Sequence, residues 1–273
     1  MLAACLALVL SGCAARFGDR FAGSVLAHQD YQLVADGLPS FLLTLDGLIA
    51  NFPKREALLR SGASLYSAYA GAFVDEPERA AYLAEHGFNY ALRAVCRFDD
   101  KLCDVRTMPL EALEKRLAKH DDEDDLPTLF ALGSAWITFI QAHSSDWAVV
   151  GELGRVQLLM EHVVAVDESY QQGQAHVYLG ALNTLLPEAL GGNPEQGRYH
   201  FEQAVRLSQG RNLMAKTLYA ERYARLVFDQ ELHDRLLAEV LAAEVAAEEF
   251  TLSNVLAVRQ AQQLKSTSAD YFE

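Results

Sequence analysis

Apolar residues recur at helical spacing along most of the chain. Phe41, Leu42, Leu45, Leu48 and Ile49, for example, share one face of a helix. Short segments rich in Pro, Gly, Asn or Asp separate such runs, as is typical of helix ends and loops. The pattern predicts an all-α protein, with helices that begin after residue 40 and cover about 54–73, 77–98, 110–119, 127–141, 149–166, 230–246 and 251–265, and further helices around residues 179, 201 and 219.

Two segments are expected to interrupt this pattern. Residues 36–40 (Asp-Gly-Leu-Pro-Ser) combine a glycine with a proline, and we expect them to break the chain before the helix that follows. The tail after Lys265 is expected to be loose as far as Tyr271 and Phe272. Beyond residues 2–10, no apolar run is expected to approach the ~20 residues that a membrane-spanning helix needs.

A large-small-x-x-large motif recurs in the second half of the chain. The first helix of a tetratricopeptide (TPR) repeat uses this arrangement, because the small residue lets the partner helix approach closely. Gly197, Phe201 and Ala204 have the spacing of the second helix. Unrelated amphipathic hairpins remain the alternative. The motif occurs at Leu132-Gly133 with Trp136, Leu179-Gly180 with Asn183, and Tyr219-Ala220 with Tyr223.

The small residues of this motif are 47 and 40 residues apart, against about 34 in a standard repeat. We therefore predict antiparallel helical hairpins stacked as a degenerate TPR-like α-solenoid, which forms a single domain over residues 31–273. Stacked hairpins of this kind present an extended binding face.

The net charge of −14 narrows the classes of partner. A nucleic-acid-binding protein needs a basic face, so no nucleic acid is expected. Acidic side chains also disfavour attraction to anionic lipids, so a membrane anchor would have to be covalent.

The N-terminus has the features of a lipoprotein signal. Nine apolar residues, 2–10, are too short to span a bilayer and suit the core of a secretory signal. Leu10-Ser11-Gly12-Cys13 matches a lipobox, so residues 1–12 are expected to be removed and Cys13 acylated, with residues 13–30 as a lipidated tether. A buried helix with an incidental cysteine is the alternative. No Lys or Arg precedes the apolar run, which leaves open an upstream start or a truncated signal.

The remaining two cysteines, Cys96 and Cys103, lie close together in sequence. In the oxidising environment outside the cytoplasm they are expected to form a disulfide, with two free thiols as the alternative. A metal site is not expected, because no further pair of Cys or His lies nearby. The acidic run at residues 121–125 is interpreted as a solvated loop that caps the next helix; a calcium loop would need a different Gly and Glu spacing.

The sequence lacks the motifs of common catalytic sites, and no enzymatic activity and no cofactor are expected. His162 and His176 lie in neighbouring predicted helices and could meet, although a buried core histidine is the simpler interpretation. The tyrosines at 66, 69, 82 and 90 suit a core, or an apolar cavity with polar rims. The candidates for lining a ligand cavity or pore are Tyr66, Tyr69, Trp136 and His176.

Several stretches of the sequence match one known family. The most specific lie within residues 187–237: Ala189-Leu190-Gly191-Gly192, Pro194-Glu195, His200-Phe201-Glu202, Asn212-Leu213-Met214, Phe228-Asp229 and residues 232–237. Other matching stretches are 36–40, 59–73, Ser145-Asp146-Trp147 and 175–180. On these stretches the chain resembles the T component associated with TRAP (tripartite ATP-independent periplasmic) transporters. Asn183 departs from the repeat pattern, in which an aromatic residue is usual.

The resemblance implies a periplasmic lipoprotein that associates with the substrate-binding (P) component of such a transporter. It also implies a ring-like homo-oligomer, a trimer with a central pore, and a small apolar ligand, and it brings no catalytic residues. The alternative is a general envelope-assembly adaptor. Ala14-Ala15 place no acidic residue beside Cys13, which favours anchoring in the outer membrane.

Overall fold

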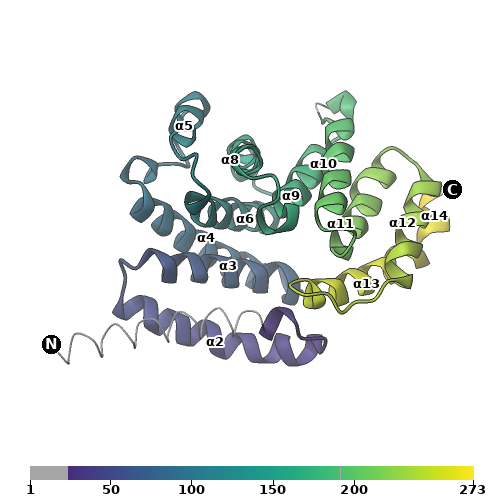
Figure 1. Ribbon diagram of the computed structural model, residues 1–273, viewed down its shortest axis with the longest axis horizontal. Coiled ribbons are helices and arrows are strands. Elements are labelled where there is room, and N and C mark those ends of the chain that lie inside the picture. The colour runs from purple at the N-terminus through teal and green to yellow at the C-terminus, as the bar shows by residue number, and fades with distance from the viewer. Residues whose placement is uncertain (1–23, 191) are drawn as a thin grey trace.

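The computed structural model describes residues 24–190 and 192–273, which form helices joined by turns, with no β-strand among them (Figure 1). The expected leader and the acylation site Cys13 lie outside the described residues. In chain order the helices of more than one turn are α2 (Tyr31–Asn51), α3 (Glu56–Phe73), α4 (Pro77–Phe98), α5 (Leu110–Leu117), α6 (Leu126–Ala142), α8 (Leu153–Val166), α9 (Gln174–Asn183), α10 (Pro194–Leu207), α11 (Leu213–Leu218), η5 (Tyr219–Ala224), α12 (Gln230–Ala242), α13 (Thr251–Ser266) and α14 (Ser268–Phe272).

Consecutive helices pair as hairpins. Helix α3 packs on α4, α6 on α8, and α9 on α10, while α11 and η5 pack against α12. Figure 1 shows these pairs following one another from the N-terminal to the C-terminal end of the molecule. The all-α architecture of sequential helical pairs that the hydrophobic pattern predicts is therefore confirmed.

Glycines set the closest approaches within the hairpins. A Cβ atom on Gly133 of α6 would lie 2.6 Å from Cε of Met160 on α8, and one on Gly180 of α9 would lie 2.8 Å from the ring of Phe201 on α10. Both distances are shorter than an ordinary carbon contact, so the helices could keep this packing around a larger residue only if the facing side chain moved. The flexible end of Met160 can move more easily than the ring of Phe201. This is the role that the repeat motif predicts for its small position.

Glycines also allow close packing in the first hairpin, α3 with α4, at positions that the sequence motif did not indicate. A Cβ atom on Gly62 of α3 would lie 2.7 Å from the ring of Tyr90, and one on Gly87 of α4 would lie 2.9 Å from Oγ of Ser67. Each helix of the pair therefore provides a glycine that faces a side chain of the other.

The break that was expected at residues 36–40 is absent, because these residues lie inside helix α2. The helix continues through Pro39, although a proline removes one backbone hydrogen bond. Five apolar side chains on one face of α2 are buried on both sides of the proline, and this packing outweighs the local cost: Val34, Leu38, Leu42, Leu45 and Ile49. Its length and hydropathy would also allow α2 to cross a membrane, contrary to the expectation for this part of the chain.

Other boundaries also differ from the expected ones. The helix predicted over 230–246 ends at Ala242. The predicted helix at 149–166 is divided into α7 (Trp147–Val150) and α8, because the chain turns at Gly151 and Glu152. The tail is ordered rather than loose. Its helix α14 begins at the buried Ser268, whose hydroxyl donates to Oδ1 of Asp234 at 2.6 Å.

The last long helix, α13, returns to the first. It packs against α11 and α12, and it also contacts α2, where the guanidinium of Arg259 lies 4.3 Å from the ring centroid of Tyr31. Buried apolar side chains form a large core cluster between residues 34 and 179 and a smaller one between residues 201 and 264. Leu252 at the start of α13 belongs to the first cluster and so connects the C-terminal helices to the N-terminal ones.

Candidate functional site

The four residues predicted to line a ligand cavity are buried. Tyr66 and Tyr69 of α3 and Trp136 of α6 belong to the large core cluster, and His176 of α9 is 1% exposed. Two small pockets of the described chain have other linings. One lies beside Pro53, Leu92 and the disulfide, and the other beside Pro187 and Val227. A ligand-lining role for the four residues stays a prediction.

Tyr66 takes part in a polar cluster that ties the first three helices together. Its hydroxyl donates to Oδ2 of Asp46 on α2 at 2.5 Å, and the hydroxyl of Tyr90 on α4 donates to Oδ1 of the same carboxylate at 2.7 Å. Burial, together with the hydrogen bond to Asp46, raises the pKa of both phenols well above its usual value. The hydroxyls therefore remain protonated donors, and the cluster has a structural role.

Trp136 is held in a second polar cluster at the turn that divides α7 from α8. Its indole nitrogen donates to Oε2 of Glu152 at 2.7 Å, and Arg106 pairs with Oε1 of Glu152 at 2.6 Å. The guanidinium of Arg106 in turn lies 5.3 Å from the ring centroid of Phe88 and 5.2 Å from that of Phe139. The turn between α7 and α8 therefore carries the carboxylate that joins Trp136 to Arg106.

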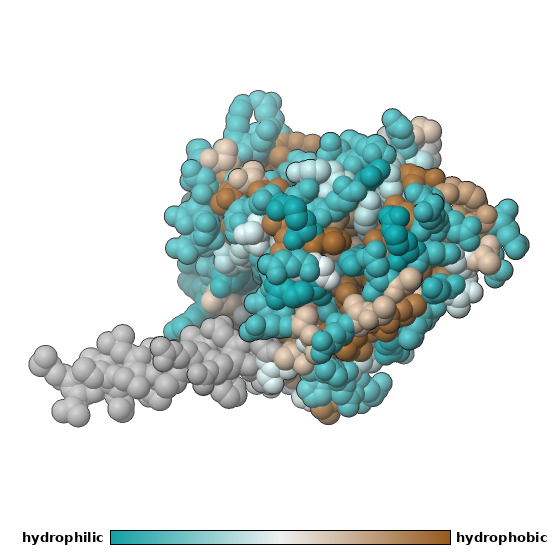
Figure 2. Space-filling model, turned by 45° about the vertical axis from the view of Figure 1, so that its right-hand side comes forward, coloured by the Kyte–Doolittle hydropathy of each residue, from teal (hydrophilic) through white to brown (hydrophobic). Residues whose placement is uncertain are grey.

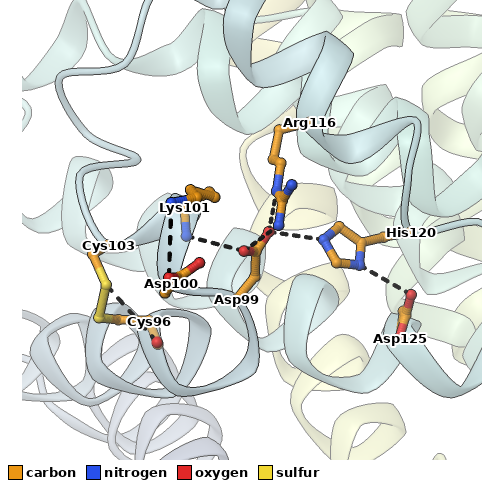
Figure 3. A network of polar contacts seen from close by, with 8 residues as sticks. All are labelled: Cys96, Asp99, Asp100, Lys101, Cys103, Arg116, His120 and Asp125. Carbon is orange, nitrogen blue, oxygen red and sulfur yellow. Dashed lines mark hydrogen bonds and ion pairs between the residues drawn. A yellow bond between two sulfur atoms is a disulfide. The ribbon is translucent and has the colours of Figure 1, made fainter.

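A third network surrounds the end of α4 (Figure 3). The side chain of Asp99 is 3% exposed and accepts two hydrogen bonds from Arg116 of α5 and one from Nε2 of His120. Burial alone would raise the pKa of Asp99, but the bonds from Arg116 and His120 outweigh it and hold this pKa well below its usual range. Nδ1 of His120 lies 3.1 Å from Asp125, so carboxylates face both ring nitrogens.

The disulfide lies beside this network. Cys96 and Cys103 are bonded in the structure, with Cα atoms 4.3 Å apart, and they bracket Asp99 (Figure 3). The bond joins the last turn of α4 to the residue directly after η1 (Asp100–Leu102). Together with the Asp99–Arg116 ion pair, it fixes the segment that leads to α5.

His176 pairs with a histidine that the sequence did not indicate. Its Nδ1 lies 2.8 Å from Nδ1 of His200 on α10, and its Nε2 is buried without a hydrogen-bond partner among the described residues. Burial lowers the pKa of both imidazoles, and proximity to His176 further lowers that of His200, to about 4. Nε2 of His162, which the sequence left as a possible partner, lies 2.8 Å from the backbone oxygen of His120 instead.

These polar clusters join helices to one another. Among residues 24–190 and 192–273, no three His, Cys, Asp or Glu side chains are grouped to hold a metal ion. Some large apolar side chains remain exposed on the described helices. Trp147 is 85% exposed directly after its cap, where Oδ1 of Asp146 accepts from the backbone of Ala148. The sequence indicated this turn but not the exposure of the indole, because exposure depends on the neighbouring helices.

Comparison with known proteins identifies the family. A family model described as TRAP transporter T-component (TAtT) matches residues 27–272. An uncharacterized protein of Treponema pallidum (strain Nichols) is 23% identical over 264 residues, which cover 90% of this chain and 81% of that protein. The family match includes α2 to α14 and every hairpin described above. The chain therefore belongs to the TRAP transporter T-component family.

Proposed function

We propose that this protein is a periplasmic lipoprotein scaffold that docks the substrate-binding P component of a TRAP transporter. The observation that carries the proposal is the family match over residues 27–272, which takes in the whole stack of helical pairs. Membership of a transporter accessory family implies a protein without enzymatic activity. Helical stacks of this kind bind partners through extended surfaces, and exposed aromatic side chains such as Trp147 are typical contact residues.

The test of docking is direct binding between purified proteins. The full acylated chain, solubilised in detergent, is immobilised and exposed to the P component of the same organism's TRAP transporter. A solute receptor of another transporter class is the control. Saturable binding of the P component alone supports the proposal. Equal binding of both receptors, or of neither, contradicts it, and recovery of outer-membrane assembly proteins instead would support the adaptor alternative.

The membrane anchor is the second part of the proposal. Acylation of Cys13, with retention in the outer membrane, would place the docking surface in the periplasm. The variant Cys13→Ala should lose incorporation of labelled palmitate and leave the membrane fraction. Cys5→Ala is the matched control, because Cys5 belongs to the segment that we expect to be removed. If Cys13→Ala retains the label, this part of the proposal is wrong.

Assembly and ligand form the third part. We expect a homotrimer in solution, which light scattering coupled to size-exclusion chromatography measures directly. A small apolar ligand passed between scaffold and P component should be recovered by organic extraction of the purified complex. A monomer at micromolar concentration, or an extract free of organic ligand, would contradict the corresponding expectation.

A further inference from the structure

Helix α2 leaves an apolar face uncovered. Its five core-facing side chains pack against α3, but Leu33 is 57% exposed, Leu43 71% and Leu48 44% on the rest of its surface. Figure 1 shows α2 along one edge of the molecule, where no described helix lies outside it. A row of large apolar side chains exposed on one helix is typical of an interaction surface.

The polar residues on this outward face make few demands on water. The hydroxyl of Thr44 and the side-chain amide of Asn51 donate to backbone carbonyls one turn earlier, at 2.9 and 2.8 Å. Such bonds let a polar side chain leave water with its donor satisfied. The charged residues of α2 are Asp46, which Tyr66 and Tyr90 hold, and Asp36 near the start of the helix. The outward face therefore suits an apolar environment along most of its length.

Cations gather where α2 ends. The guanidinium of Arg55 lies 5.6 Å from the ring centroid of the half-exposed Phe52, and Nη2 of Arg93 donates to the carbonyl of Pro53 at 3.3 Å. Arg97 lines the same pocket as Pro53 and Arg93. Four cationic side chains at this turn or beside it form no ion pair among the described residues: Lys54, Arg55, Arg93 and Arg97.

Most carboxylates near this turn are already engaged. Three have ion pairs within the chain: Glu56 with Arg60, Asp99 with Arg116, and Asp100 with Lys101. Asp104 is the one acidic residue of segments 52–56 and 93–104 without an ion pair in the described part of the chain. Although the net charge of the protein is −14, this turn should therefore attract anions.

The charges at the other end of α2 are mixed. Asp30 accepts a hydrogen bond from the backbone N–H of Leu33 at 3.0 Å, and the guanidinium of Arg259 lies over the ring of Tyr31. The C-terminal end of the molecule, which Figure 2 turns toward the viewer, is mixed as well, with hydrophobic side chains exposed among hydrophilic ones. The apolar face of α2 with a basic turn at its end differs from both.

The position of the proposed anchor indicates a membrane as the occupant. Even when fully extended, the chain between Cys13 and Ser24 reaches at most about 40 Å, and α2 is the first long helix after it. An apolar helix face with cations at its margin is the pattern of a helix that lies in the membrane interface. There the apolar side chains enter the boundary between head groups and acyl chains, and the cations meet lipid phosphates.

We infer that the outward face of α2 lies on the bilayer to which Cys13 is anchored. Leu33, Leu43 and Leu48 contact the acyl-chain boundary, and Lys54 and Arg55 lie beside lipid phosphates. This inference rests on the proposed acylation and adds an orientation to it. Because α8 and α10 lie at the opposite edge from α2 in Figure 1, they would face away from the membrane.

The test measures how deeply an introduced indole lies in the bilayer. The full acylated chain with Leu43→Trp is reconstituted in vesicles of phosphatidylethanolamine and phosphatidylglycerol with brominated acyl chains. Bromine quenches on contact, so the emission of the new indole should fall by about half or more relative to unbrominated vesicles. Leu110→Trp, at a 48% exposed position on α5, is the matched control. It should be quenched no more than the unaltered chain, in which Trp136 is buried and Trp147 lies on α7.

Further variants test whether the contact holds the protein on the membrane. Leu43→Glu changes a largely exposed position, so the thermal midpoint should stay the same. Transfer of the acylated chain from donor to acceptor vesicles should nevertheless become about tenfold faster or more, and Leu110→Glu should not change it. Lys54→Glu should speed transfer only from vesicles that contain phosphatidylglycerol, with Lys119→Glu as the control for net charge.

The outcomes separate this inference from the proposed anchor. If the unaltered chain is acylated but Leu43→Trp is quenched no more than Leu110→Trp, the inference is wrong while the anchor stands. Without such quenching, a smaller oligomer or lost P-component binding in Leu43→Glu would assign the face to a second copy or to the P component, and would equally overturn the inference. If Cys13 carries no acyl group, the proposed anchor itself fails.

Discussion

At the residue scale, the contact between His176 and His200 makes stability depend on pH. Only one proton can lie between two Nδ1 atoms 2.8 Å apart, so protonation of both rings would place two positive charges in a buried site. The charges of Glu168 and Arg206 have opposite effects on the pKa of His176, the first raising it and the second lowering it. Burial therefore dominates, and the folded protein disfavours the charged form.

The first prediction concerns His200→Gln. The pKa of His200 is about 4 in the folded protein against about 6.5 in the unfolded chain, so the unfolded chain binds more protons between these values. Stability is then fully present above pH 6.5 and is lost as the pH falls toward 4. Glutamine does not titrate, so the variant should show a shallower loss. Urea denaturation at several pH values measures it, and identical slopes for both proteins would contradict the assignment.

Sequence alone revealed part of these residue contacts. The sequence predicted a bond between Cys96 and Cys103 because they are close together in the chain. It also indicated Tyr66 as a core residue with a polar tip. The contact between His176 and His200 could not be predicted from the sequence, because 24 residues separate them. Which side chains meet depends on how α9 and α10 are aligned against each other. The exposure of Leu43 was equally hidden, since a leucine in an apolar run is normally buried.

At the element scale, the disulfide and the Asp99–Arg116 ion pair hold the end of α4 against the segment that leads to α5. The second prediction is that replacing both Cys96 and Cys103 with serine lowers the free energy of unfolding by about 2 kcal/mol, the chain-entropy value for so short a loop. Chemical denaturation measures the loss. The intact mass of the unaltered protein should increase by two hydrogen atoms on reduction, and no increase would show free thiols instead.

The third prediction compares three glycines. Gly180→Ala should destabilise the protein by about 1–2 kcal/mol, because its Cβ would meet the rigid ring of Phe201. Gly133→Ala should be nearly neutral, since Cε of the flexible Met160 can move and alanine favours the helix. Gly47→Ala on α2 meets nothing within 4 Å and should stabilise by up to about 1 kcal/mol. Equal effects in urea denaturation would contradict this ranking.

Helix positions were predicted well where local and tertiary signals agree. The boundaries of α4 follow from Pro77 at the start and Phe98 at the end, and Gly180 was recognised from its repeat motif. The continuous α2 was missed because Gly37 and Pro39 signal a turn locally, whereas burial on both sides of Pro39 decides the outcome. Packing that involves distant helices does not appear in a local pattern.

At the scale of the whole molecule, Leu252 links the last helices to the core of the first ones. The fourth prediction is that Leu252→Ala lowers the unfolding midpoint measured at Trp136, which lies in the same core cluster more than one hundred residues earlier. Loss of the buried side chain should cost about 2–4 kcal/mol. Trp147→Phe provides the background in which Trp136 fluorescence is read alone. An unchanged Trp136 transition would show that the two ends unfold independently.

The contact between α13 and α2 has a mechanical consequence. Hairpins that touch only their neighbours behave as a spring, which bends and stretches under small forces. Here a stretch along the stack must also separate Arg259 from Tyr31 and withdraw Leu252 from its cluster. When the two ends of the helical stack are pulled apart, its force–extension curve should therefore show one abrupt rupture in place of gradual extension.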